Sequence, residues 1–337
     1  MFNHYFLSSL TRIADFDTVP FEVKPLSRTH WATGDYVLGE VIPPLNPAAK
    51  VELTNGRMAN LLPGDLIVGA FGIRQATLEI VGDWQDIPTD NSLHALTAAG
   101  LFGKATSVSH LLSSPPALMY QGHLLREGQK LSMADFINPL PEQSYQCPTI
   151  MIIGTSMSAG KTTAARVIIR LLRQMGLRVI GAKLTGAGRY RDILAMQDAG
   201  AQQIFDFVDV GLPSSICEPE LFRLRLRQLL TKIAATKPDV VVAEAGASPL
   251  EPYNGSIVLE EMRSQIKYTI LCASDPYAVV GVTQGFQWQP DLITGVATST
   301  SAGVQLIEKL TGIKALTLPE RKSWQQLADL LLTHLQE

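Results

Sequence analysis

The first part of the chain consists of short runs in which apolar and polar residues alternate. The runs are YVLGEVI (36–42), KVELTNGRM (50–58), DLIVGAFG (65–72) and TLEIVGDW (77–84). Such alternation, bounded by turn residues, is typical of β-strands with one buried face. Asn55-Gly56 tolerates the positive φ values of a tight turn, so it predicts a β-hairpin within the second run. Residues 93–133 suggest more strands and one helix, which together predict a β-rich, barrel-like module.

From Thr149 onward the pattern changes to continuous apolar runs that alternate with helix-like segments. The runs are TIMIIG (149–154), RVIGAKL (178–184), DVVVAEAG (239–246), YTILCAS (268–274), DLITGVAT (291–298) and KALTL (314–318). The helix-like segments include 162–175, 220–235 and 302–310. Strands that are apolar without interruption are covered on both faces, which predicts a mostly parallel sheet.

A segment with two prolines and no periodicity, residues 138–144, separates the two patterns. Because 337 residues exceed the usual size of one domain, we predict two domains, 1–143 and 144–337. The first is a smaller β-rich domain of unknown role.

Composition and charge narrow the class of protein. The chain is 46% hydrophobic and 18% charged, which predicts folding throughout. Its formal net charge is −3 and it has no block of basic residues, so nucleic acid is not an expected partner. Residues 1–16 lack the apolar core of a signal peptide, and no apolar run is long enough for a membrane span, so we expect a cytoplasmic protein without membrane contact. The three cysteines form no CxxC pair, so we expect them to be reduced.

The strand TIMIIG runs directly into a glycine-bounded loop and then into a helix. The loop reads Gly154, Thr155, Ser156, Met157, Ser158, Ala159, Gly160, Lys161, Thr162 and Thr163. Backbone N–H groups and the positive end of the helix face an anion in this arrangement, and Gly160 lets the backbone approach it. Lys161 can then reach the β- and γ-phosphates, and Thr162 can supply a hydroxyl to Mg²⁺. The pattern predicts a phosphate-binding loop in an α/β, P-loop NTPase domain.

Five residues separate Gly154 from Gly160, one more than in the usual P-loop. This spacing resembles dethiobiotin synthetase and its relatives, which carry Gly-Thr-Asp-Thr-x-x-Gly-Lys-Thr. In length and in its extra N-terminal domain, the chain is more similar still to a mostly uncharacterised P-loop family, a domain of unknown function that includes D-glutamate N-acetyltransferases. The resemblance covers about residues 148–320. Ser156 stands where the synthetases have an Asp that helps to hold the metal.

Three further residues complete the predicted site. Lys183 begins a stretch that resembles the Lys-Pro-x-x-(Ser/Thr)-Gly of the synthetases, which implies a second catalytic cation beside Lys161; a surface lysine is the alternative. Glu244 ends a buried strand, where ligands of open α/β sheets bind, and an acidic residue there can hold Mg²⁺, unless it is merely solvated. Asp192 is the carboxylate chosen to replace the metal ligand missing at Ser156, with a helix N-cap as the alternative.

These residues predict catalysis by positioning and charge neutralisation. The leading hypothesis is a Mg²⁺-dependent enzyme of the ligase or kinase type, which uses ATP, or GTP, to phosphorylate a small carboxylate-bearing metabolite. One alternative is an N-acyltransferase that uses acetyl-coenzyme A on an amino acid. Another is a nucleotide-switched binding protein. The preference for ATP and the expected homodimer come from the resemblance alone.

Overall fold

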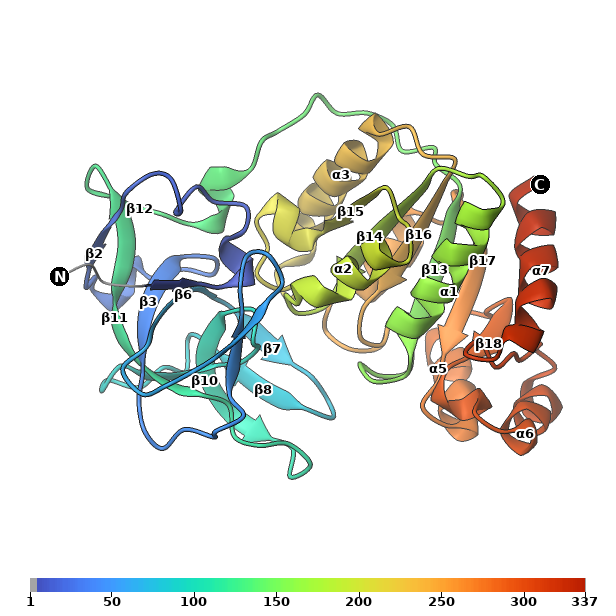
Figure 1. Cartoon of the computed structure of the whole chain (residues 1–337), viewed down its shortest axis with the longest axis horizontal. Helices are drawn as coiled ribbons and strands as arrows, with labels where there is room; N and C mark the ends of the chain where they lie inside the picture. Colours follow the sequence, from blue (N-terminus) through green and yellow to red (C-terminus); the bar gives the residue numbers. More distant parts are fainter. Residues whose placement is uncertain (1–4, 337) are drawn as a thin grey trace. The chain divides into compact units, whose positions relative to one another are not determined.

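The computed structural model describes residues 5–336. The predictions for residues 1–4 and 337 therefore lie outside the described residues. The described residues form two compact units (Figure 1). The first comprises 5–139 together with 187–191 and 207–216, and the second comprises 140–186, 192–206 and 217–336. The boundary between residues 143 and 144 stays a prediction. Within 5–336, no helix has the length and apolar character needed to cross a membrane.

The first unit is built on a ten-stranded sheet, part of which closes on itself. Five strands form the closed part: β3 (Tyr36–Val41), β6 (Leu66–Phe71), β9 (Ser92–Ala95), β10 (Leu101–Val108) and β11 (Ala117–Arg126). They pair in the order β6-β3-β11-β9-β10, and a parallel pairing of β10 with β6 completes the ring. The other strands of the sheet are β1 (Tyr5–Leu7), β2 (Glu22–Lys24), β7 (Ile73–Gln75), β8 (Ile80–Asp83) and β12 (Gln129–Lys130). The β-rich prediction is therefore confirmed.

Apolar residues at alternate strand positions fill this barrel, among them Ile67, Phe71 and Phe102. Gly69 is required where the ring of Phe102 lies against the backbone, since a Cβ there would approach the ring to 2.6 Å. The predicted hairpin is present as β4 (Lys50–Glu52) and β5 (Met58–Asn60), paired antiparallel around a turn in which Gly56 has φ +82°. The helices between residues 5 and 139 are all short 3₁₀ turns: η1 (Ser9–Thr11), η2 (Arg28–His30) and η3 (Met133–Phe136).

The second unit contains a six-stranded sheet in the order β15-β14-β16-β13-β17-β18. Its strands are β13 (Thr149–Gly154), β14 (Val179–Thr185), β15 (Gln203–Asp206), β16 (Val240–Ala245), β17 (Ile266–Cys272) and β18 (Leu292–Thr294). Every pairing within it is parallel, which confirms the predicted sheet. The fully buried β13, β14 and β16 correspond to the most continuous apolar runs.

Two of the predicted strands differ from the structure. The run 291–298 is a strand only to Thr294, because Gly295 adopts φ +100° and the chain turns into η5 (Val296–Thr298). The predicted strand KALTL is reduced to one bridge, between Ile293 and Ala315. Its apolar residues Leu316 and Leu318 are buried because they belong to the core rather than to a strand. Conversely, β15 was not predicted, since its sequence QIFD has no continuous apolar run.

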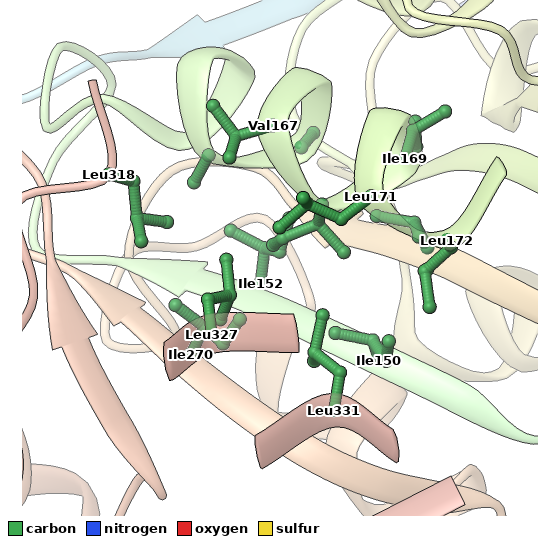
Figure 2. Close-up of a cluster of buried hydrophobic side chains, with 14 of the residues drawn as sticks. Ile150, Ile152, Val167, Ile169, Leu171, Leu172, Ile270, Leu318, Leu327 and Leu331 are labelled. Atoms are coloured by element: carbon green, nitrogen blue, oxygen red, sulfur yellow. The ribbon is translucent and has the colours of Figure 1, made fainter. Parts of the chain in front are cut away.

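The core of the second unit lies between the sheet and two helices, α1 (Lys161–Gln174) and α7 (Trp324–Gln336). Figure 2 shows Val167 and Leu171 of α1 in one buried cluster with Leu327 and Leu331 of α7 and with Ile150 and Ile152 of β13. The remaining helices are α2 (Tyr190–Asp198), α3 (Pro219–Ala235), α4 (Gly255–Glu261), α5 (Pro276–Phe286), α6 (Ser301–Thr311), η4 (Phe207–Val210) and η6 (Arg321–Ser323). The predicted helical segments correspond to α1, α3 and α6.

Candidate nucleotide and metal site

The loop between β13 and α1 has the local conformation that a phosphate-binding loop requires. Gly160 precedes the first residue of α1 and adopts φ +102°, a left-handed conformation that favours glycine. A Cβ at this position would also meet the Cα atom of Gly295 at 3.3 Å. The first N–H groups of α1, which have no partner within the helix, begin directly after this turn. Strand β13, this loop and helix α1 therefore have the arrangement of a phosphate-binding loop at the carboxyl edge of a parallel sheet.

Lys161 lies back across the loop. Its side chain is buried, and Nζ donates a hydrogen bond to the carbonyl oxygen of Ser156 at 2.7 Å. The side chain of Lys161 passes close to Gly154, where an added Cβ would lie 2.9 Å from both Cδ and Nζ of Lys161. The glycine at the start of the loop thus makes room for the lysine at its end.

The segment after β17 braces the other side of the loop. Thr155 donates its backbone N–H to the carbonyl oxygen of Cys272 at 3.0 Å, and its Oγ1 accepts from the backbone N–H of Ser274 at 3.0 Å. Asp275 is occupied in capping α5, because its Oδ1 accepts from two backbone N–H groups at 2.9 Å. The start of the loop is therefore held by Cys272 of β17 and by Ser274, which follows that strand.

The remaining residues of the loop differ in accessibility. Ser158 and Thr163 are exposed, Met157 and Thr162 are half-buried, and Ala159 is buried. Thr162 lies in the first turn of α1, as the motif predicts. Ser156 is buried, and its hydroxyl has no hydrogen-bond partner among residues 5–336.

A cluster of charged side chains lies at the carboxyl ends of three neighbouring strands. In the sheet register, Lys183 of β14 is paired with Glu244 of β16 on one side and with Asp206 of β15 on the other. Lys183 Nζ also forms an ion pair with Asp192 Oδ2 at 2.6 Å. Burial by itself lowers the pKa of Lys183, but the charges of Asp192, Glu244 and Asp206 outweigh burial and raise it.

Glu244 is a buried acid of this cluster. It is 3% exposed, and its Oε2 has no hydrogen-bond partner within residues 5–336. Burial raises the pKa of Glu244, the positive charges of Lys161 and Lys183 oppose that shift, and the charge of Asp192 adds to it. A buried carboxylate oxygen without a partner is costly unless a ligand completes its shell.

The donors of the site fit Mg²⁺. In the part of the chain that the structure describes, no group of three or more His, Cys, Asp or Glu side chains is arranged as a metal cage. Proteins commonly hold Mg²⁺ by one or two carboxylates together with substrate phosphates and water. The unpartnered oxygen of Glu244 has the chemistry of such a ligand.

The structure brings most of the sequence-predicted residues together. Glu244 interacts electrostatically with Lys161, Lys183 and Asp192. Asp192 is not the N-cap of α2 but its third residue, where it is engaged by Lys183. Sequence reasoning missed Asp206, because β15 was not recognised as a strand. The rule that ligands meet the carboxyl ends of parallel strands points to this residue once the strand is known.

No protein-family model matches the chain, and no curated protein matches it. Solved structures with similarity include the hydrogenase maturation factor HypB from Archaeoglobus fulgidus, with 15% identity and a TM-score of 0.39 over 57% of this chain and 91% of that chain. Chloroplast FtsY from Physcomitrella patens has 15% identity and a TM-score of 0.36, over 52% and 59%. A DUF1611 family protein from Anabaena variabilis has 13% identity and a TM-score of 0.35, over 58% and 61%. These similarities assign no activity to this chain.

Proposed function

We propose that the protein is a Mg²⁺-dependent enzyme that binds a nucleoside triphosphate, ATP in preference to GTP, and transfers a phosphoryl group to a small carboxylate-bearing metabolite. The observation that carries the proposal is the buried, unpartnered oxygen of Glu244, beside Lys161 of the P-loop and Lys183 of the next strand. A buried acid between two buried lysines is suited to a ligand that carries both a cation and phosphate groups.

Each residue has a distinct role in this proposal. Lys161 contacts the β- and γ-phosphates, while the backbone of residues 154–160 surrounds them. Glu244, Thr162 and Asp192 would hold Mg²⁺, and the ion would supply neutralisation of the phosphate charge. Lys183 lies at the acceptor side, where it orients the carboxylate of the metabolite.

The proposed reaction forms one bond and breaks one. An oxygen of the acceptor carboxylate forms a bond to the γ-phosphorus as the bond from that phosphorus to the β–γ bridging oxygen breaks. The products are an acyl phosphate and the nucleoside diphosphate, which takes the bridging electrons. Two positive side chains near the transferring group stabilise charge that moves toward that bridging oxygen.

The ion pair between Lys183 and Asp192 has a role in the state without the metabolite, and both residues have a different partner in the state with it. A metabolite carboxylate that reaches Lys183 replaces Asp192 as the partner of Nζ. Asp192 is then available to the metal. We also propose a homodimer and a small-molecule acceptor, neither a nucleic acid nor a membrane surface.

Isothermal titration of ATP, GTP and acetyl-coenzyme A, each with and without Mg²⁺, tests the proposal. The wild type is expected to bind ATP only with Mg²⁺, and Lys161→Ala and Glu244→Gln are each expected to weaken binding by about ten- to a hundredfold, because a charge-assisted contact is lost. Lys309→Ala, at an exposed position of α6, is the matched control and should bind as the wild type does.

The outcomes separate the candidate functions. Stronger binding of GTP than of ATP would leave the proposal of phosphoryl transfer intact, but the nucleotide would then carry guanine rather than adenine. Binding of acetyl-coenzyme A without any nucleotide would overturn the proposal in favour of acyl transfer. Nucleotide binding with no phosphate release in a screen of carboxylate metabolites would favour a nucleotide-switched binding protein.

A further inference from the structure

Glu52 is a buried carboxylate to which the proposed reaction assigns no role. It ends β4, is 1% exposed, and accepts three hydrogen bonds. Its Oε2 accepts from Ser9 Oγ at 2.6 Å and from the backbone N–H of Tyr190 at 2.8 Å, and its Oε1 accepts from the backbone N–H of Arg191 at 2.9 Å. All four residues belong to the first unit.

The two backbone groups that Glu52 binds are the first two of helix α2. The first N–H groups of a helix have no acceptor within the helix, and the N-terminal end carries partial positive charge. A carboxylate at this position satisfies two of these donors and interacts favourably with the helix dipole. Capping residues usually stand next to the helix in sequence, whereas Glu52 is 138 residues from Tyr190.

Further contacts within the first unit hold the residues that lead into α2. Gly188 donates its backbone N–H to the carbonyl oxygen of Pro213 at 3.1 Å, and Ala187 forms a β-bridge with Ser214. The guanidinium of Arg12 lies over the ring of Tyr190, 4.6 Å from its centroid. The start of the helix is therefore held through its backbone and through a side chain.

The residue that follows Arg191 in the helix is Asp192, the partner of Lys183 at 2.6 Å. We propose that Glu52 is a positioning residue, which fixes the first turn of α2 and thereby the place at which Asp192 meets Lys183. The effect on turnover rests on the proposed function, whereas the effect on the ion pair does not need a ligand.

The first experiment needs no nucleotide. We compare the wild type, Glu52→Gln and Glu52→Ala in two measurements. One is the rate of hydrogen exchange at the amides of Tyr190 and Arg191, and the other is the rate of acetylation of Lys183, followed by mass spectrometry. Both rates are expected to rise at least tenfold in Glu52→Ala and less in Glu52→Gln, which keeps one acceptor oxygen. Asp65→Asn is the matched control, because Asp65 also accepts a backbone N–H, that of Leu62 at 2.7 Å, but does so in a turn distant in sequence from α2. It should leave both rates unchanged.

The second experiment separates positioning from general loss of structure. Glu52→Gln is expected to weaken binding of Mg²⁺ and ATP only in part, because Lys161, Thr162 and Glu244 are unaltered and Asp192 alone is displaced, while kcat for phosphoryl transfer falls about tenfold. Glu52→Asp should recover part of that loss. Unchanged exchange and acetylation in Glu52→Ala would overturn the inference, and so would an unaltered kcat in a variant whose α2 amides exchange faster. If the wild type binds no nucleotide, the proposed function fails, while the first experiment still decides the inference.

Discussion

At the scale of single residues, the two glycines of the P-loop serve different physical needs. Gly154 makes room for the end of Lys161, a flexible side chain, whereas Gly160 combines a left-handed backbone with close approach to the backbone of Gly295. An added methyl group at the first position displaces a side chain. At the second it strains the main chain and presses on another segment.

We therefore predict that the two alanine substitutions affect different properties, nucleotide binding in one case and stability in the other. Gly154→Ala should weaken nucleotide binding at least tenfold with little change in the free energy of unfolding, because Lys161 must move. Gly160→Ala should lower that free energy by about 1–3 kcal/mol. Gly176→Ala is the matched control for Gly160→Ala, since Gly176 has φ +83° but no heavy atom within 4 Å of an added Cβ. Titration and chemical denaturation measure both effects; a smaller loss in Gly160→Ala than in Gly176→Ala would contradict the packing argument.

At the scale of elements, helix α7 is held by one face. Leu327 and Leu331 lie in the core (Figure 2). Leu332, the next residue, is 38% exposed. The stability of a surface helix comes mainly from such burial rather than from its own hydrogen bonds.

Leu331→Ala should therefore lower the free energy of unfolding by about 2–5 kcal/mol, through lost burial and the cavity that remains. Leu332→Ala removes the same atoms from a partly exposed position and should change that free energy by about 1 kcal/mol or less. Urea denaturation of both variants measures the difference. Equal losses would mean that α7 does not dock through the face of Leu331.

At the scale of the whole molecule, the compact units do not coincide with a single cut in the chain. Residues 187–191 and 207–216 belong to the first unit, although they follow the P-loop in sequence. These segments supply partners to polar side chains of residues 5–139. The backbone N–H groups of Tyr190 and Arg191 donate to Glu52, and the carboxylate of Asp209 pairs with Arg12 at 2.9 Å.

A fragment of residues 1–143 should consequently fold poorly by itself. Without the later segments Glu52 loses two of its three donors and Arg12 loses its acidic partner, and buried polar groups without partners are destabilising by about 1–3 kcal/mol each. Circular dichroism melting of the fragment, beside the full chain, is the measurement. A cooperative transition at the temperature seen for the full chain would contradict this expectation.

Local patterns predicted the parts of the molecule that depend on neighbours in sequence. The alternating runs predicted β3 and β6, the uninterrupted runs predicted β13 and β16, and Asn55-Gly56 predicted the hairpin. The same reasoning failed where burial comes from distant packing. Leu316 and Leu318 resemble a strand because they are apolar, yet they lie in the core without pairing, and β15 pairs with β14 although its sequence carries no clear signal.

The sequence by itself determined the change from alternating to uninterrupted apolar strands, the glycine-bounded loop between β13 and α1, and the types of residue available for chemistry, because each of these is encoded within a few consecutive positions. Only the tertiary structure decided which of those residues meet. The pairing of Lys183 with Asp192, the register that brings Glu244 and Asp206 to either side of Lys183, and the capping of α2 by Glu52 all join segments separated along the chain. Such contacts depend on strand order and register, which no local pattern contains.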